Sequence, residues 1–438
     1  MITTEGILTK YRSLAHEAAA ILPIGRVTRV MGLVIESAGP YAPIGEICVL
    51  RDKRGSEAAR CEIVGFRDNF ILSMPIGEIR SIEPGMEIVA TGAGLTVSPS
   101  NDMLGRVLDG LGNPIDDKGE LPPSSRRSIY AQPPNPMSRR RIVEPIETGT
   151  RAIDGLLTMG KGQRIGIFAG SGVGKSTLMG MIARNTNADV NVIALIGERG
   201  REVLDFIEKD LGEDGLKRSV VIVSTSDTPP LARIKAAYVA TTIAEYFRDE
   251  GLDVMMMMDS VTRLAMAQRE AGLSIGEPPT TKGYTPSVFA MLPQLMERAG
   301  TSADGSITAL YTVLVEGDDM NEPIADAARG ILDGHIVLTR KLAAMGHYPA
   351  IDVLESISRL MGDVAAPEHR RIARQFKEMM AAYREAEDLI SVGAYQRGSN
   401  ALVDKAIDRK KETDDFLRQD YDEYCAMRTA IEQLGKVV

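Results

Sequence analysis

The stretch Arg164–Thr177 constrains the fold of this chain more than any other, because it joins a short apolar run to a glycine-rich loop. It reads RIGIFAGSGVGKST, and the helical pattern LMGMIARN follows it. In a strand–loop–helix arrangement of this kind, successive backbone N–H groups and the positive end of the helix face one anion. The sequence therefore predicts a phosphate-binding loop at the end of a buried strand.

The loop departs from the strict pattern G-x-x-x-x-G-K-[ST] at one position, where Ala169 stands in place of the first glycine. Alanine is small and need not adopt a positive φ there, so the pattern still holds. Lys175 is expected to reach the outer phosphates of a nucleotide, and Ser176 to ligate Mg²⁺. The predicted nucleotide-binding residues of the loop are Ala169, Gly170, Ser171, Gly172, Val173, Gly174, Lys175, Ser176 and Thr177. A glycine-rich surface turn is the alternative, and the strand–loop–helix context argues against it.

The composition limits the class of protein. The 438 residues allow two or three domains, and a formal charge of −9 argues against an extended nucleic-acid surface. The scattered cysteines and histidines have no metal-ligand spacing, which predicts reduced thiols in a cytosolic protein and no zinc site. The charged N-terminus predicts no signal peptide, and no apolar run is long enough to span a membrane, so any membrane contact is expected to be peripheral.

The chain before the loop divides into distinct segments. Residues 1–21 place apolar side chains at helical spacing, which predicts a helix that either packs on its own domain or docks a partner helix or membrane surface. Residues 22–93 hold short β-rich runs separated by Gly, Pro and Asp, and predict a β-barrel. Residues 94–145 form a turn-rich and proline-rich linker whose basic clusters are either a solvated face or a contact for anionic partners.

The remaining sequence predicts an α/β domain followed by helices. Up to residue 363, apolar runs alternate with helical patterns, which indicates a parallel sheet covered on both faces. With its linker this domain spans 94–363, and phosphate sites in such sheets lie at the carboxyl ends of the strands. Residues 364–438 are helical and highly charged and predict a C-terminal helical domain. The predicted fold class is therefore α/β, with an N-terminal β-barrel, a central P-loop domain and a C-terminal helical domain.

Acidic residues end other apolar runs of the predicted sheet. Asp259 follows Val254–Met258, and a carboxylate at the end of an apolar strand is costly unless it is paired or serves a cation. Beside a phosphate loop Asp259 would hold the Mg²⁺ shell; a helix N-cap is the alternative. Glu198 ends another run and could aim a water at the γ-phosphate, while Arg199 could balance phosphate charge. By spacing, a surface salt-bridge cluster explains Glu198 and Arg199 equally well.

Further motifs stand in a fixed order between about Gly25 and Gln419. They are AGSGVGKST (Ala169–Thr177), GERGREV (Gly197–Val203), MMMMDSVTRLAMAQRE (Met255–Glu270), GEPPTTKGYTPSVFAMLPQLMERAG (Gly276–Gly300) and HYPAIDVLESISR (His347–Arg359). In these stretches the chain resembles the ATPase of the flagellar type III export apparatus, a family similar to the catalytic subunit of F-type ATP synthases. The extended loop FAGSGVGKST with GERGREVLDFIE favours the flagellar branch over the injectisome ATPases of virulence secretion.

The resemblance implies a β-barrel, a RecA-like ATPase core and a C-terminal helical domain, assembled as a homohexameric ring with ATP at the subunit interfaces. ATP and Mg²⁺ are the implied cofactors. Carried over residue by residue, Lys175 would contact the β- and γ-phosphates and Ser176 would ligate Mg²⁺. Asp259 would be the Walker B acid, Glu198 the carboxylate that activates water, and Arg199 the arginine that adjoins it.

The resemblance also assigns residues that spacing would leave as structural. Arg359 stands where the family places an arginine finger, which is supplied across a subunit interface, and Tyr348 matches the aromatic residue that stacks on adenine. The catalytic residues are then Lys175, Glu198, Arg199 and Arg359.

The implied partners are proteins. The family binds a negative-regulator, stator-like protein through the N-terminal tail. Its C-terminal helices face the central stalk protein, export chaperones and substrates, and the export gate is a further partner. The implied location is the cytoplasm, peripheral to the inner face of the cytoplasmic membrane, with no nucleic acid bound.

The leading hypothesis is an ATP hydrolase that energises flagellar protein export, and an injectisome ATPase is the alternative within the family. From another class, an RNA-translocating hexameric helicase shares the same core, but the acidic chain and the lack of aromatic-plus-basic stacking motifs in the barrel count against it. A non-catalytic nucleotide-binding subunit is a further alternative, and Glu198 argues against it.

Overall fold

The computed structural model describes residues 23–77, 82–315, 317 and 319–438. The helix predicted over residues 1–21 lies outside these residues. The described residues form two compact units, one within Met1–Thr96 with the short segments Pro229–Leu231 and Glu270–Glu277, and the other containing the rest. None of the described helices is long and apolar enough to cross a bilayer.

The first unit contains the predicted β-barrel. Its antiparallel strands close in the order β1-β2-β5-β4-β3-β6. The strands are β1 (Ile24–Met31), β2 (Val34–Ala38), β3 (Glu46–Arg51), β4 (Glu57–Arg67), β5 (Phe70–Pro75) and β6 (Glu87–Gly94). Side chains such as Ile35, Leu50 and Ile88 are fully buried and form its core. This arrangement confirms the barrel that the short β-rich runs predicted.

The second unit is built on a largely parallel sheet in the order β19-β18-β12-β17-β15-β13-β14-β8, with β16 paired to β17. The strands are β8 (Arg106–Asp109), β12 (Arg164–Ala169), β13 (Val190–Ile196), β14 (Ser219–Ser224), β15 (Asp253–Asp259), β16 (Gly300–Thr301), β17 (Ser306–Leu314), β18 (Gly334–Leu338) and β19 (Ile357–Ser358). Met255–Met258 in β15 are fully buried, as expected for a strand covered on both faces. The parallel sheet predicted from the apolar runs is confirmed.

Strand β8 and the two-residue strands β16 and β19 are parts of the sheet that the sequence did not indicate, and β8 lies within the region predicted as a linker. Arg106–Asp109 is short and sits among glycine turns, so no periodic pattern marks it. The strand extends the sheet by pairing in parallel with β14. A partly buried ion pair joins the strand to the turn that follows it, with Arg106 Nε donating to Asp116 Oδ2 over 2.8 Å. The strand conformation of these residues therefore depends on pairing with β14 and not on local propensity.

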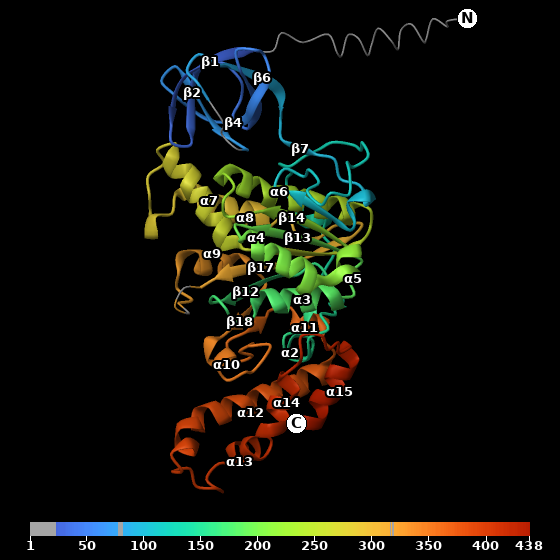
Figure 1. Cartoon of the computed structure of the whole chain (residues 1–438). Helices are drawn as coiled ribbons and strands as arrows, with labels where there is room; N and C mark the ends of the chain where they lie inside the picture. Colours follow the sequence, from blue (N-terminus) through green and yellow to red (C-terminus); the bar gives the residue numbers. More distant parts are fainter. Residues whose placement is uncertain (1–22, 78–81, 316, 318) are drawn as a thin grey trace, which may run out of the picture. The chain divides into compact units, whose positions relative to one another are not determined.

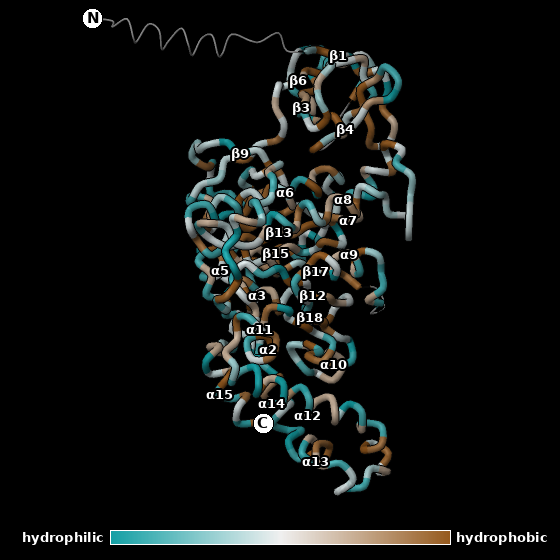
Figure 2. Tube along the Cα trace, turned by 180° about the vertical axis from the view of Figure 1, so that it is seen from behind, coloured by the Kyte–Doolittle hydropathy of each residue, from teal (hydrophilic) through white to brown (hydrophobic). Residues whose placement is uncertain are grey.

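Helices cover both sides of the sheet. In both views α6, α7 and α8 lie on one side of the strands, and α3 and α5 lie on the other (Figures 1 and 2). The helices of this domain are α2 (Arg151–Leu156), α3 (Lys175–Asn185), α4 (Gly200–Asp205), a π-helical turn (Phe206–Leu211), α5 (Gly212–Lys217), α6 (Pro230–Asp249), α7 (Val261–Ser274), α8 (Pro286–Met296), α9 (Pro323–Ile331), α10 (Arg340–Ala344) and α11 (Met361–Val364).

The predicted C-terminal helical domain follows and shares a core with the sheet domain. Its helices are α12 (Pro367–Ser391), α13 (Ala401–Asp408), α14 (Lys410–Leu417) and α15 (Met427–Val437). Phe376 and Phe416 pack in one continuous hydrophobic cluster with Ile153 and Leu156 of α2. Arg151 of α2 adds a hydrogen bond from Nε to the Phe416 carbonyl over 3.1 Å. Helix α2 is therefore the joint between the sheet and the C-terminal helices.

A buried ion pair fastens the linker to the sheet domain. Arg298 is 1% exposed, and its Nε and Nη2 donate to the two carboxylate oxygens of Glu245 over 2.9 and 2.6 Å. Its Nη1 donates to the carbonyl of Ile129 in the linker over 2.7 Å. One guanidinium thus ties α6, the segment after α8 and the linker together.

We expect Arg298→Ala to destabilise this unit by about 3–5 kcal/mol, because the Glu245 carboxylate would remain buried without its partner. The measurement is the shift of the urea and thermal unfolding transitions. Arg371→Ala is the matched control, since Arg371 forms an exposed ion pair with Glu368 and its loss should leave the transition nearly unchanged. Equal shifts in the two variants would contradict the role given to Arg298.

Candidate functional site

The phosphate loop connects the carboxyl end of β12 to the first turn of α3. Gly172 and Gly174 have φ of +78° and +90°, a conformation that favours glycine and turns the backbone N–H groups inward. Gly174 is the N-cap of α3, and in the described chain no side chain caps the helix there. The first-turn N–H groups are therefore available to an anion, as the loop sequence predicted.

Three of the predicted side chains converge beside this loop. Lys175 Nζ donates to Asp259 Oδ1 and lies 3.8 Å from Glu198 Oε1. The side chains of Lys175, Asp259 and Glu198 are 11%, 4% and 15% exposed. They meet because β12, β13 and β15 are parallel, so that the residues at or just beyond their carboxyl ends share one edge of the sheet. The surface salt-bridge alternative for Glu198 does not fit this burial.

The environment of Glu198 makes it a candidate general base. Burial, and then the nearby charge of Asp259, raise the pKa of Glu198 from 4.5 to about 7, while Lys175 acts in the opposite direction. Glu198 Oε1 is buried and has no hydrogen-bond partner within the described residues. A carboxylate with a pKa near neutrality and a free acceptor oxygen is suited to take a proton from a water molecule.

A cavity of about 580 Å³ borders Lys175 and Glu198, and it is lined by the loop, Arg199 and residues of α7. The side chain of Arg199 is largely exposed and forms an ion pair of 3.5 Å with Glu202 at the border of this cavity. Arg263 of α7 was missed by the sequence reasoning. Its Nε is buried without a hydrogen-bond partner in the part of the chain that the structure describes, and its charge lowers the pKa of Glu198.

The signal for Arg263 was its place in the first turn of α7, which begins two residues after Asp259 ends β15. Gly197 makes room for it. A Cβ at Gly197 would lie 2.9 Å from Arg263 Cβ, and Gly197 has a φ of +71°. The glycine that precedes Glu198 therefore serves both the sharp turn and the close approach of this arginine.

Tyr348 lies on the other side of the loop. A Cβ at Gly174 would be 3.6 Å from its ring, and the residue is 47% exposed. It lines a separate cavity of about 910 Å³ together with Thr177, Met181 and residues 418–421 of the C-terminal domain. An exposed aromatic ring beside a phosphate loop is placed to stack on a nucleotide base. The sequence reasoning found the tyrosine but not the C-terminal residues that complete this cavity.

The structure does not bring Arg359 to the loop. Arg359 follows β19, whose Ser358 pairs with Gly334 at the start of β18, whereas Ala169 at the loop pairs with Leu338 at its end. These two ends of β18 are separated by about 13 Å of extended strand. Arg359 is exposed, and its backbone N–H donates to the carbonyl of Asp333 over 3.0 Å. Within one chain, Arg359 and the Lys175 cluster lie at opposite ends of the sheet.

The donor set at the loop fits Mg²⁺. Ser176 lines the cavity and offers a hydroxyl, and Asp259 offers a carboxylate beside Lys175. Oxygen ligands are those that this hard cation takes. Among the described residues, no three acidic, histidine or cysteine side chains are grouped as a metal cage. Mg²⁺ commonly binds through one or two carboxylates with substrate phosphates and water, so the loop needs no such cage.

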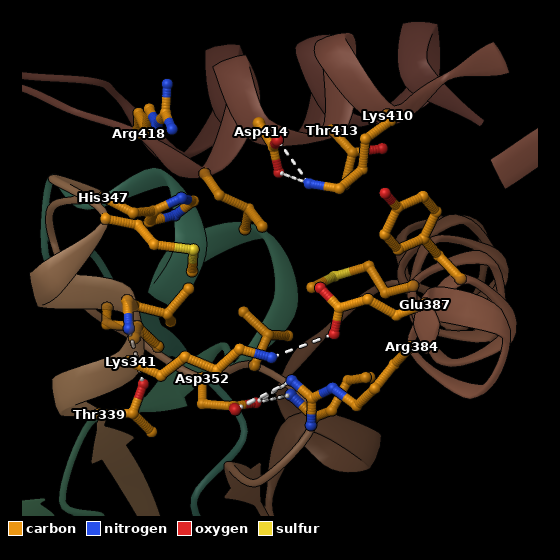
Figure 3. Close-up of a pocket in the computed structure, with 18 of the residues that line it drawn as sticks. Thr339, Lys341, His347, Asp352, Arg384, Glu387, Lys410, Thr413, Asp414 and Arg418 are labelled. Atoms are coloured by element: carbon orange, nitrogen blue, oxygen red, sulfur yellow. Dashed lines mark hydrogen bonds and ion pairs between the residues drawn. The ribbon is translucent and has the colours of Figure 1, made fainter. Parts of the chain in front are cut away.

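A further cavity of about 380 Å³ lies between the segment that follows β18 and the C-terminal helices (Figure 3). Its charged walls are largely paired internally: Lys341 with Glu387 over 3.0 Å, and Arg384 with Asp352 over 2.8 Å. None of the predicted site residues is among the described residues that line it. This cavity is therefore distinct from the one at the phosphate loop.

Glu198→Gln should stabilise the nucleotide-free protein increasingly as the pH rises. Because the folded state holds the Glu198 proton more tightly than the unfolded chain, ionisation weakens the fold between pH 4.5 and about 7. We expect the free energy of unfolding of the variant to rise by up to about 3 kcal/mol at pH 8 and by less than about 1 kcal/mol near pH 5, measured by urea unfolding in EDTA. Glu208→Gln, at an exposed glutamate, is the control. A gain that does not change with pH would contradict the raised pKa.

Comparison with known proteins identifies the domains. The chain matches the ATP synthase alpha/beta family, with its beta-barrel domain at residues 27–92 and its nucleotide-binding domain at 149–358. Residues 365–436 match the T3SS EscN ATPase C-terminal domain. These matches cover the barrel, the sheet with its phosphate loop, and the C-terminal helices.

Whole-chain relatives extend the match. The chain is 57% identical to the flagellum-specific ATP synthase of Bacillus subtilis over 94% of each chain. It is 52% identical to the type 3 secretion system ATPase of Xanthomonas euvesicatoria over 94% of this chain and 93% of that one. The assembled ATPase EscN from the enteropathogenic E. coli type III secretion system has a TM-score of 0.90 and 45% identity, covering 94% of this chain and 99% of that one. The chain therefore belongs to the family of flagellum-specific and type III secretion ATPases.

Proposed function

We propose that this protein hydrolyses ATP to ADP and phosphate and that it energises flagellar type III protein export. The observation that carries the proposal is the meeting of Lys175, Glu198 and Asp259 beside an uncapped helix N-terminus. A cation, a metal-binding carboxylate and a carboxylate with a pKa near 7 are the parts that nucleotide hydrolysis requires.

Each side chain has a distinct role in the proposed reaction. The loop N–H groups and Lys175 bind the β- and γ-phosphates, and Ser176 and Asp259 hold Mg²⁺. When bound, Mg²⁺ neutralises charge on the phosphate oxygens. Glu198 orients the attacking water and accepts its proton, while Arg199 and Arg263 add positive charge at the border of the cavity. Tyr348 stacks on the adenine.

The proposed active unit is a homohexameric ring in which each chain lends Arg359 to its neighbour's site. Support comes from the position of Arg359, which is exposed and lies at the opposite end of the sheet from the Lys175 cluster of its own chain. A homomer must carry both halves of such a site on every copy, as this chain does. The relative EscN has been observed as an assembled ATPase and with its central stalk EscO.

The proposal of a flagellar system rests on the 57% identity to the flagellum-specific relative from Bacillus subtilis. A virulence-type secretion ATPase is the alternative, which the 52% identity to the Xanthomonas protein supports. We further propose that the C-terminal helices face a central stalk protein, export chaperones and substrates, and that the export gate is a partner. The tail 1–21 would bind a stator-like negative regulator, with the ring in the cytoplasm, peripheral to the inner face of the membrane.

Turnover should depend on Lys175 and Glu198. We expect Glu198→Gln to bind ATP but to hydrolyse it about 10²–10⁴-fold more slowly, because general-base catalysis is lost. Lys175→Ala should lose both binding and turnover. The measurements are phosphate release and equilibrium binding of a fluorescent ATP analogue, with Lys217→Ala at an exposed lysine as control. Activity retained in both site variants would remove the proposed mechanism, and hydrolysis that requires RNA would favour the helicase alternative.

Mixing experiments test the contribution of Arg359 across a subunit boundary. Arg359→Ala should lower turnover by about 10³–10⁵-fold, the range known for arginine fingers. Adding Glu198→Gln chains should restore part of the activity, because each can lend its intact Arg359 to a neighbour with an intact Glu198. The control is the double variant Glu198→Gln/Arg359→Ala, which should restore nothing. Failure of the single variants to complement one another would argue against a shared site.

A further inference from the structure

Thr312 lies next to the metal-binding carboxylate but belongs to none of the motifs considered so far. It is fully buried in β17, the strand between β12, which leads into the phosphate loop, and β15, which ends in Asp259. Its Oγ1 donates a hydrogen bond of 2.7 Å to Asp259 Oδ1. A hydroxyl on the central strand therefore reaches directly to the acidic residue at the end of the neighbouring strand.

The two oxygens of Asp259 have different surroundings. Oδ1 receives the hydrogen bond from Thr312 and also the one from Lys175 Nζ. For Oδ2, no hydrogen bond to a protein group is present among the residues that the structure describes. The carboxylate is thus held at one oxygen while the other stays available to a ligand.

The two donors to Oδ1 are not equivalent during the proposed reaction. Lys175 is needed by the phosphates once a nucleotide binds, and its long side chain can follow them. Thr312 is a β-branched residue in a strand, so its χ1 is restricted and its hydroxyl stays beside Asp259. When nucleotide is present, Thr312 is therefore the donor that continues to fix the orientation of Asp259.

We infer that Thr312 is a positioning residue for Mg²⁺: its hydroxyl fixes Asp259 Oδ1 so that Oδ2 faces the metal and its water shell. This inference rests on the proposed role of Asp259 in the ATPase reaction. It adds a residue from a fourth strand to the site and assigns a function to a buried hydroxyl. A hydrogen bond to a charged acceptor is among the stronger ones in a protein interior, so its loss should be measurable.

The same strand provides a matched control. Thr308 is also fully buried in β17, four residues earlier and on the same face, and its Oγ1 accepts the Gly162 N–H over 2.8 Å. Thr308→Val and Thr312→Val each replace a buried hydroxyl by a methyl group of similar shape. A merely structural contribution of the hydroxyls would therefore affect both variants alike.

The decisive measurement is the Mg²⁺ dependence of nucleotide affinity, which needs no turnover. A fluorescent ADP analogue is titrated into the full chain in excess Mg²⁺ and in EDTA. For Thr312→Val we expect an unchanged Kd in EDTA. The increase in nucleotide affinity caused by Mg²⁺, called here the Mg²⁺ gain, should be about tenfold smaller than in the wild type. Thr308→Val should lower the unfolding temperature but keep the Mg²⁺ gain of the wild type. Thr312→Ser, which retains the hydroxyl, should also show the wild-type Mg²⁺ gain.

Hydrolysis assays separate this inference from the proposed function. If the wild type hydrolyses ATP, Thr312→Val should lower kcat by about 10- to 100-fold and raise the Mg²⁺ concentration needed for half-maximal activity. A Mg²⁺ gain in Thr312→Val equal to that of the wild type would overturn the positioning role, whatever the turnover. A wild type that does not hydrolyse ATP, but whose Mg²⁺ gain depends on Thr312, would overturn the proposed function and leave this inference standing.

Discussion

The convergence of one lysine with two carboxylates at the edge of a parallel sheet is the interaction on which the rest of the site depends. Lys175 is 11% exposed, and a buried ammonium of this kind must be paired. Asp259 and Glu198 provide the pairing, and each is delivered by the register of a separate strand. A phosphate oxygen is also an anion, so a bound phosphate could take over the pairing of Lys175 from one of these carboxylates.

Within this cluster, Glu198 and Asp259 differ in their hydrogen-bond partners. Asp259 accepts hydrogen bonds from both Lys175 and Thr312, whereas Glu198 Oε1 has no hydrogen-bond partner among the described residues. The shared cation is closer to Asp259, and Glu198 is left with burial and a like charge that raise its pKa to about 7. Two carboxylates on neighbouring strands thus have different hydrogen-bond surroundings.

Local sequence was sufficient for the fold class and for the loop, because both depend on short-range patterns. The runs that became β12, β13 and β15 are continuous and apolar, and the loop glycines stand where the turn needs them. Strand β8 could not be predicted in this way, since pairing with β14 makes it a strand. Thr312 was missed for a similar reason: a threonine in an apolar strand looks like any other β-branched residue until its neighbour across the sheet is known. The resemblance to a family, rather than any spacing, drew attention to Arg359 and Tyr348.

The cavity beside Tyr348 is built partly from residues 418–423, and these are held by the joint at α2. Arg151 donates to the carbonyl of Arg418 and to the Glu423 carboxylate, and the Arg151 N–H donates to Gln419 Oε1 over 2.8 Å. The Gln419 N–H in turn donates to the carbonyl of Tyr348 over 2.9 Å. A displacement of the C-terminal helices would therefore reshape the wall of this cavity beside Tyr348. By thermodynamic reciprocity, a partner that displaces those helices and a ligand that occupies the reshaped cavity would alter each other's affinity by the same factor.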